Sequence, residues 1–408
     1  MSHSTINEPL IILVLAGVIF VSMFGRGLAR RIGLPGMVAF LLIGIAINVG
    51  YSFADGLPES LVVVIDILAK LGVVTLLFEA GMHTNVQKLV RQLRRVVATW
   101  AGNVVVAGGL GYVAARYLLG LELVPSIVIG VALTATSVGV SVAVWEERRL
   151  EDTKSGRLFL GIAGLDDISA VVLMAILFDV APILRGTEGG PLGEMIATRL
   201  LLTLATLAGF GALCVLFSRF VEHRLRTALQ RFESPAASLL SVIAVSIIIA
   251  ACAGLLGFSV AIGAFFAGLA FSGDPEALRE RIAFDVIYDL FVPFFFIGIG
   301  LSINLSVALE ALVPGLVLLA VAIVGKLLAN AGGTLAHSGA TGATAIGVSM
   351  VPRAEITMVV MQKARSLGAW AAPQTAYAAM ALVSLVTVVV APLILRRVLG
   401  RLERAHDS

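Results

Sequence analysis

Residues 161–170 read Gly-Ile-Ala-Gly-Leu-Asp-Asp-Ile-Ser-Ala and place two adjacent carboxylates, Asp166 and Asp167, in an apolar run from about 158 to 180. A run of about 20 such residues can cross a lipid bilayer as a helix. A carboxylate at that depth is costly, so it marks an ion or proton pathway. Because two adjacent carboxylates repel each other, their titrations are coupled. The stretch therefore predicts a site that exchanges a proton for a cation.

The alternative interpretation of the Asp-Asp pair is a water-exposed loop, as in many soluble proteins. Ile162, Leu165 and Ile168 flank the pair without a turn signal, which favours a helix. On a helix, adjacent side chains point about 100° apart. One aspartate can then face Lys326 while the other faces the interrupted helix of the fifth span.

The composition predicts a polytopic membrane protein. Hydrophobic residues make up 59% of the 408 residues and charged residues only 13%, whereas a soluble domain has about 25% charged residues. The apolar runs are long and continuous and lack the alternation of a membrane β-barrel, so we expect an all-α fold. The net charge of +3 comes from loop arginines and does not indicate a nucleic-acid surface.

Hydropathy predicts about thirteen membrane-spanning segments. They lie near 9–25, 34–50, 60–82, 97–119, 123–145, 155–181, 197–220, 236–255, 257–273, 285–302, 308–336, 341–365 and 372–397. An amphipathic stretch, 86–96, is expected to link the third and fourth spans. The short tail 398–408 follows the last span.

The distribution of positive charge predicts the orientation. Most of the 29 Lys and Arg residues fall in loops on one side of these spans, and such loops are cytoplasmic. The N-terminus is then outside and the C-terminus cytoplasmic, in what we expect to be a bacterial inner membrane. The first span follows Glu8 without a basic region, which indicates a retained helix and not a cleaved signal peptide.

A repeated pattern predicts an inverted repeat. Gly81-Met82-x-x-Asn85 ends the third span, and Gly300-Leu301-x-x-Asn304 ends the tenth. An odd number of spans separates them, so the two copies must have opposite orientations. Thr136 of the fifth span and Glu355 of the twelfth are separated by the same number of residues as these two motifs. We therefore expect a first repeat over 1–181, a linker span over 182–235 and a second repeat over 236–397.

The fifth and twelfth spans are both interrupted by residues that disfavour a continuous helix. The fifth contains 134–139, Thr-Ala-Thr-Ser-Val-Gly, and the twelfth contains 350–355, Met-Val-Pro-Arg-Ala-Glu. Helix breaks at membrane depth are tolerated where they line a cavity or are buried in protein. Thr134, Thr136 and Ser137 would offer hydroxyl and carbonyl oxygens to a small cation; the alternative is that the hydroxyls bond to their own helix. Arg353 and Glu355 would compensate the dipoles of the half-helices and each other's charge, a structural role that we favour over ion binding.

Other charged groups also lie at membrane depth. Lys326 is far from either end of its span, so we expect it to pair with one of the two aspartates rather than to extend to the membrane surface. Glu79 has no evident local partner and is either a cavity acid or an interfacial residue. His83 lies at a membrane boundary, where a solvated loop histidine is the simpler interpretation. Asp66 and Lys70 are spaced to pair on one helix.

These residues resemble the bacterial monovalent cation/proton antiporters, specifically the second cation/proton antiporter family. The resemblance covers nearly the whole chain and rests on motifs in the same order and spacing. The motifs are Phe78-Glu79-Ala80-Gly81-Met82, Thr134-Ala135-Thr136-Ser137-Val138-Gly139, Gly164-Leu165-Asp166-Asp167, Gly325-Lys326 and Pro352-Arg353-Ala354-Glu355. The family fold has thirteen helices, with a dimerisation domain and a core domain that holds two crossed, broken helices.

The resemblance implies roles for the charged residues. Asp167 would bind Na⁺ and carry the proton, and Asp166 would pair with Lys326. An Asp-Asp pair with a lysine is similar to the electrogenic sodium/proton members. The resemblance also implies a homodimer, which the glycines of the first two spans (Gly17, Gly25, Gly36 and Gly44) would allow to pack closely. His83 departs from the family, whose members often have an acidic residue there.

The sequence thus predicts antiport of Na⁺ or Li⁺ against H⁺ by an alternating-access, elevator-type movement. A K⁺/H⁺ antiporter is the nearest alternative. A cation channel would be expected to show several ligand rings in file, and a sodium-coupled symporter would need a second, larger cavity. The chain shows no catalytic triad, metal-ligand spacing or phosphate loop, so we expect neither an enzyme nor a cofactor.

Overall fold

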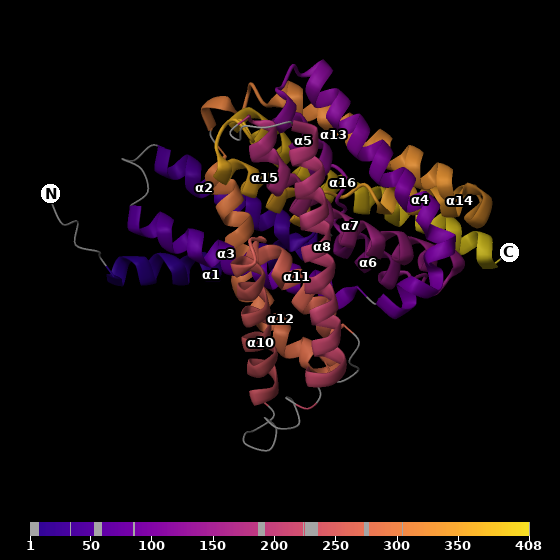
Figure 1. The fold of residues 1–408 in the computed structure, drawn as a ribbon, viewed down its shortest axis with the longest axis horizontal. Coiled ribbons are helices and arrows are strands. Elements are labelled where there is room, and N and C mark those ends of the chain that lie inside the picture. The colour runs from indigo at the N-terminus through magenta and orange to yellow at the C-terminus, as the bar shows by residue number, and fades with distance from the viewer. Residues whose placement is uncertain are drawn as a thin grey trace.

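The computed structural model of the chain is a bundle of helices (Figure 1). The structure describes residues 8–32, 34–52, 59–84, 86–186, 192–222, 224, 236–272, 277–303 and 305–407. Within these residues every regular element is a helix, and eight helices are long and apolar enough to span a membrane. The predicted all-α membrane fold is confirmed.

The long helices follow the predicted spans. They are α1 (Glu8–Arg31), α2 (Gly36–Ser52), α3 (Glu59–His83), α4 (Val86–Val113), α5 (Leu123–Ala132), α6 (Val138–Glu147), α7 (Lys154–Leu184), α8 (Leu192–Phe217), α10 (Ala236–Leu255), α11 (Val260–Phe271), α12 (Ala277–Ser302), α13 (Leu312–Lys326), α14 (Gly332–Ser349), α15 (Glu355–Leu367) and α16 (Gln374–Asp407). Short elements are the π-helical turns η1 (Ala114–Leu118), η2 (Ser218–Glu222) and η4 (Leu327–Ala331), and the 3₁₀ turn η3 (Leu305–Val307).

Two boundaries differ from the sequence-based prediction. The stretch 86–96 is not a separate link, because α4 runs unbroken from Val86 to Val113. Its residue Val96 is fully buried against Gly161 of α7, where the absence of a side chain leaves room for it. At the other end of the chain, residues 398–407 continue α16 as a helix.

Two groups of helices lie at opposite ends of the molecule. The N-terminal helices α1 and α2 lie at the opposite end from α4, α6 and α14 (Figure 1). Helix α7, which carries the Asp-Asp pair, packs against α4, α5, α8 and α14. Its start is fixed by Thr153, whose hydroxyl accepts a hydrogen bond from the Gly156 amide at 3.2 Å, as expected of an N-cap. This capped helix positions the two aspartates among the broken spans.

Close glycine contacts join helices from the two predicted repeats. A Cβ atom on Gly300 of α12 would lie 2.5 Å from the carbonyl oxygen of Leu41 on α2, and one on Gly44 of α2 would lie 2.3 Å from that of Ile297 on α12. Helix α3 meets α11 in the same way. In each of these pairs, one helix comes from the predicted first repeat and the other from the predicted second repeat. The remaining members of the repeated pattern, Asn85 and Asn304, lie outside the described residues.

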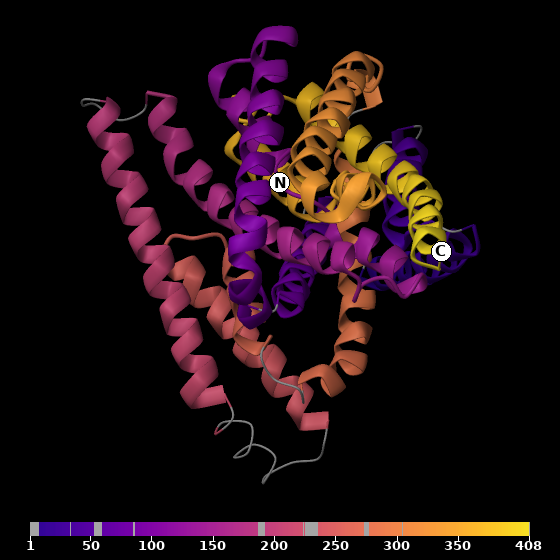
Figure 2. The same cartoon turned by 90° about the vertical axis from the view of Figure 1, so that its right-hand side faces the viewer.

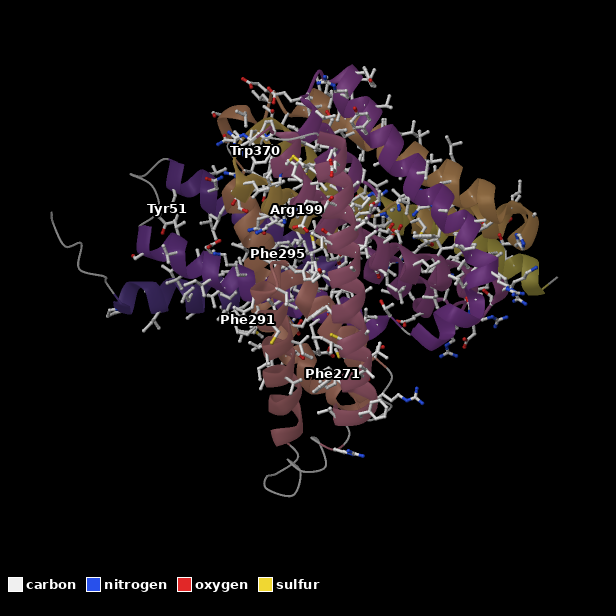
Figure 3. All side chains as sticks on the ribbon, viewed as in Figure 1. Tyr51, Arg199, Phe271, Phe291, Phe295 and Trp370 are labelled. Atoms are coloured by element: carbon white, nitrogen blue, oxygen red, sulfur yellow. The ribbon has the colours of Figure 1, made fainter. Side chains whose placement is uncertain are left out.

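A third close contact lies between α3 and α12. Phe291 and Phe295 are about one turn apart on α12 (Figure 3). A Cβ atom on Gly72 of α3 would lie 2.5 Å from the carbonyl oxygen of Phe291 and 3.1 Å from Cβ of Phe295. Contacts this short explain why small residues are abundant in these spans, because helices associate in lipid mainly by close packing.

Helix α8, the predicted linker span, runs along the outside of the bundle (Figure 2). It buries one stripe, formed by Thr203, Leu207, Phe210 and Cys214, and packs against α7 and α11. Leu201 and Leu213 on its other faces are 69% and 62% exposed. Such exposure of large apolar side chains suits a helix that faces lipid.

Candidate ion-binding site

The two interrupted spans meet at their breaks. The first break separates α5 from α6, and the second separates α14 from α15. The backbone amide of Ser137 in the first break donates to the carbonyl oxygen of Pro352 in the second at 2.8 Å. The hydroxyl of Thr357 on α15 donates to the carbonyl oxygen of Ala132, the last residue of α5, at 3.0 Å. The two non-helical segments therefore satisfy part of each other's backbone hydrogen-bonding capacity, as irregular backbone at membrane depth requires.

Lys326 and Asp166 form a buried ion pair beside these breaks. The Lys326 ammonium lies 3.2 Å from Oδ2 of Asp166, and neither side chain has any solvent exposure. Lys326 also donates to the carbonyl oxygen of Thr134 at 2.6 Å and to Oγ1 of Thr136 at 2.9 Å. These three contacts use all three donors of the ammonium group. Lys326 therefore pairs with the aspartate that the family resemblance implies.

The two threonines of the first break have different contacts. The Thr134 hydroxyl donates to the carbonyl oxygen of Val131, three residues earlier in α5, at 2.8 Å, which is the back-bonding alternative. The Thr136 hydroxyl instead donates to Oδ2 of Asp166 at 2.6 Å. The Thr136 hydroxyl thus bonds to both members of the ion pair, while Thr134 contributes only its backbone carbonyl oxygen, which accepts from Lys326.

Asp167 has a different environment from Asp166. It is half-buried, and among the residues that the structure describes no hydrogen bond or ion pair reaches its carboxylate. The charged groups that act on it electrostatically are Asp166, Glu355 and Lys326. A carboxylate of this kind has its full coordination capacity available to a ligand, whereas that of Asp166 is occupied.

Arg353 and Glu355 lie at the ends of half-helices. Arg353 is fully buried and donates from Nη1 to the carbonyl oxygen of Ala135, just past the C-terminal end of α5. Glu355 is the first residue of α15, and Ser137 at the end of the first break lies beside it. A cation at a helix C-terminus and an anion at a helix N-terminus both interact favourably with the partial charges of the helix dipole. No ion pair joins Arg353 to Glu355 within the described part of the chain.

The acidic residues of α3 lie nearer to its exposed ends. Glu79 is 23% exposed, and its carboxylate lies 3.4 Å from Nε2 of His83. It acts electrostatically on Glu355, which places its charge in the surroundings of the second break. Asp66 and Lys70 form an exposed pair at 2.7 Å on the same helix.

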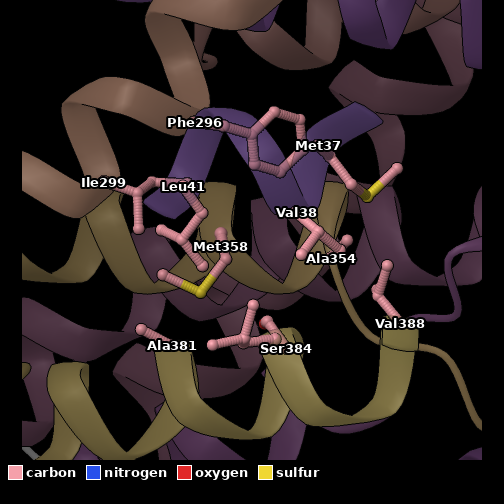
Figure 4. Close-up of a pocket in the computed structure, with 11 residues that line it drawn as sticks. Met37, Val38, Leu41, Phe296, Ile299, Ala354, Met358, Ala381, Ser384 and Val388 are labelled. Carbon is pink, nitrogen blue, oxygen red and sulfur yellow. The ribbon is translucent and has the colours of Figure 1, made fainter. Parts of the chain in front are cut away.

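A small cavity also adjoins the second break, between α2, α12, α15 and α16 (Figure 4). Its volume is about 20 Å³, and apolar residues such as Met37, Phe296 and Met358 line it together with Ser384. A cavity of this size holds at most a single water molecule. Its apolar lining does not suit an alkali cation, which binds to oxygen ligands.

Two buried amides complete the surroundings of the ion pair and were missed by sequence reasoning. Asn103 of α4 donates from Nδ2 to Oδ1 of Asp166 at 2.5 Å. Asn330 of η4 donates from Nδ2 to Oδ1 of Asn103 at 2.9 Å. The available signal was that each is a polar side chain inside an apolar span, as Lys326 is.

A known protein family matches nearly the whole chain. The family described as sodium/hydrogen exchanger, transmembrane, matches residues 16–401. The chain belongs to the sodium/hydrogen exchanger family, and it is therefore a membrane transporter and not an enzyme.

Individual relatives match over most of their length. The chain is 29% identical to the high-affinity Na⁺/H⁺ antiporter NhaS3 of Synechocystis sp., over 95% of this chain and 90% of the relative. It is 27% identical to the Na⁺/H⁺-K⁺ antiporter GerN of Bacillus cereus, over 93% and 94% of the two chains. The solved structure of the sodium proton antiporter MjNhaP1 from Methanocaldococcus jannaschii shares the fold, with a TM-score of 0.70, 14% identity, and coverage of 95% and 96%.

Proposed function

We propose that this protein exchanges Na⁺ or Li⁺ for H⁺, with Asp167 as the cation ligand and proton carrier. The observation that carries the proposal is the contrast between the two adjacent aspartates. Asp166 is fully buried and bonded to Lys326, Thr136 and Asn103. Asp167 is half-buried and has no such bond among the described residues. A carboxylate without partners at membrane depth is stable only if it binds a cation or a proton.

The proposed cycle makes cation and proton compete for Asp167. When the cation enters, it attracts Asp166 and weakens the contact between Asp166 and Lys326. Lys326 then releases its proton, so that two protons leave for each Na⁺ that binds. Each turnover moves one net charge, and the exchange is electrogenic.

The proposed movement is alternating access by an elevator-type displacement of the helices that carry the site. Two breaks that bond to each other and to the ion pair would move as one unit, which supports such a displacement. By the positive-inside rule the N-terminus would be outside and the C-terminus cytoplasmic, in a bacterial inner membrane. We also propose a homodimer.

The first experiment reconstitutes the wild-type protein in liposomes and imposes a pH gradient. Exchange is followed by a pH-sensitive dye after addition of Na⁺, Li⁺ or K⁺, with choline as the control cation. We expect Na⁺ and Li⁺ to collapse the gradient with saturation kinetics. A cation flux that does not saturate and moves no protons would indicate a channel and would contradict the proposal.

Exchange of K⁺ is the second candidate function. The observation that favours it is the name of the relative GerN, a Na⁺/H⁺-K⁺ antiporter. The same liposomes separate the two candidates, because a K⁺ exchanger would dissipate the gradient with K⁺ at concentrations at which Na⁺ has little effect.

A further inference from the structure

Asn103 and Asn330 have no part in the exchange cycle described above, yet both are fully buried next to its ion pair. Burying an amide is unfavourable unless its polar atoms form hydrogen bonds. In the apolar interior of α4 and η4, an aliphatic residue would fill the same space without that cost. The contacts that the two amides make should therefore have a function.

The two amides close a ring of hydrogen bonds around the ion pair. Nδ2 of Asn103 donates to Oδ1 of Asp166 at 2.5 Å, and Oδ1 of Asn103 accepts from Nδ2 of Asn330 at 2.9 Å. Nδ2 of Asn330 also donates to the backbone carbonyl oxygen of Lys326 at 3.0 Å. The Lys326 ammonium returns to Oδ2 of Asp166 at 3.2 Å. The ring thus joins both ends of Lys326 to both oxygens of Asp166.

The backbone next to Lys326 is shaped for this ring. The π-helical turn η4 begins directly after Lys326 and ends at Ala331. A π-helical turn interrupts the regular helical ladder and is frequent at functional sites. Here it places Asn330 where one amide group reaches both Asn103 and the carbonyl oxygen of Lys326.

The ring leaves neither oxygen of Asp166 free. Oδ1 is held by Asn103, and Oδ2 is held by Lys326 and Thr136. Before a cation enters the site, the carboxylate therefore has a fixed orientation toward Lys326. Without Asn103 it could rotate, and the ammonium of Lys326 could then approach the adjacent Asp167 as a tethered competitor of the transported cation.

We propose that Asn103 and Asn330 are positioning residues that hold Asp166 to Lys326 and so keep Asp167 available for the cation. This inference rests on the exchange function proposed above. The two amides do not touch the cation; they act through Asp166. Their loss should weaken the apparent affinity for Na⁺ more than the maximal rate.

The test compares Asn103→Leu with the matched control Asn48→Leu. Asn48 also forms an amide hydrogen bond between two segments of the chain, from Nδ2 to the carbonyl oxygen of Ile303 at 2.6 Å, but it lies on α2 outside the ring. Sodium-dependent proton flux in liposomes gives KM and maximal rate for each variant. We expect Asn103→Leu to raise the KM for Na⁺ about tenfold or more. A change of this size corresponds to the free energy lost when one hydrogen bond to a charged group is removed. Asn103→Gln keeps the amide group, so its KM for Na⁺ should be closer to that of the wild type.

A double-substitution cycle separates positioning from a general structural effect. In the Lys326→Gln background no ammonium can compete for Asp167, so Asn103→Leu should change the KM by less than about twofold. The inference is overturned if Asn103→Leu leaves the KM unchanged in the wild-type background. It is also overturned if Asn48→Leu raises the KM as much, or if the effect persists in Lys326→Gln.

If the proposed exchange activity itself is wrong, the liposome experiment gives a result that differs from failure of the positioning role. In that case wild-type liposomes would show no proton flux with any cation. The positioning role is then tested by thermal unfolding of the purified proteins in NaCl against choline chloride. Stabilisation by Na⁺ that is lost in Asn103→Leu and kept in Asn48→Leu supports the inference, and equal stabilisation of both variants contradicts it.

Discussion

Gly81 of α3 and Gly268 of α11 lie so close together that neither position has room for a methyl group. A Cβ atom on Gly81 would lie 3.0 Å from Cα of Gly268, and one on Gly268 would lie 2.9 Å from Cα of Gly81. The Cβ on Gly268 would also lie 2.0 Å from the carbonyl oxygen of Phe78. Backbone atoms cannot give way as a flexible side chain can. The crossing of these two helices therefore depends on glycine at both positions.

This contact predicts that Gly268→Ala lowers the stability of the folded protein. The added methyl must separate α3 from α11, and overpacking of this kind costs about 1–3 kcal/mol. Thermal unfolding in detergent should show a lower midpoint. Gly209→Ala on α8 is the control, because a Cβ there meets no atom within 4 Å. Equal midpoints for the two variants would show that the helices are less closely packed than described.

The two threonines of the first break provide a matched pair of variants. Thr136→Val removes a hydroxyl that contacts both Asp166 and Lys326. Thr134→Val removes a hydroxyl that bonds only to the carbonyl oxygen of Val131, three residues earlier. We expect Thr136→Val to lower stability by about 1–3 kcal/mol and to reduce exchange, because buried charged groups lose a partner. Thr134→Val should resemble the wild type in both assays, and a larger defect in that variant would contradict the assignment.

How much of this site could be predicted from the sequence depends on the kind of residue. Asp166, Asp167 and Lys326 stand out because a charge in an apolar run has few explanations. The breaks were visible because Thr-Ala-Thr-Ser and Pro-Arg-Ala-Glu interrupt apolar spans. The division of contacts between Thr134 and Thr136 was not predictable, because it depends on where Lys326 lies.

The amide ring was also out of reach of sequence reasoning. Asn103 and Asn330 carry no charge, and nothing in the sequence indicates that α4 and η4 approach each other. The glycines were ambiguous for a similar reason, because the sequence does not tell whether a glycine packs within one chain or between two. Gly44 was expected to help two copies of the chain to pack, but in the structure it lies against Ile297 of the same chain. The amphipathic pattern of 86–96 likewise did not reveal that this stretch continues into α4.

The proposed homodimer then needs a surface other than Gly44. Phe20 and Phe24 of α1 are each 72% exposed and lie one turn apart. We expect these residues to face the second copy. With Cys214 and Cys252 replaced by Ala, Phe24→Cys should form a disulfide-linked dimer in lipid, whereas Leu201→Cys on the outer face of α8 should not. A chain that remains monomeric by native mass measurement in both detergent and lipid would contradict the dimer.

Lys326 should determine whether exchange moves charge. In Lys326→Gln the second proton is lost, so Na⁺ and H⁺ should exchange one for one without net charge. Charge movement on a supported membrane, measured beside proton flux by dye, checks this. Lys70→Gln, at an exposed lysine of α3, is the control and should behave like the wild type. If Lys326→Gln stays electrogenic, the second proton is carried by another group, and Asp166 and Glu79 are the next candidates.

The most direct test of the account is sodium-dependent proton flux in liposomes that contain Asp167→Asn. An amide cannot carry the proton and lacks the charge that holds the cation. We predict a folded protein whose Na⁺-driven proton flux is abolished, while Asp66→Asn, at the exposed carboxylate of α3, retains wild-type flux. Full exchange by Asp167→Asn would contradict the central claim that this carboxylate binds the cation and the proton in turn.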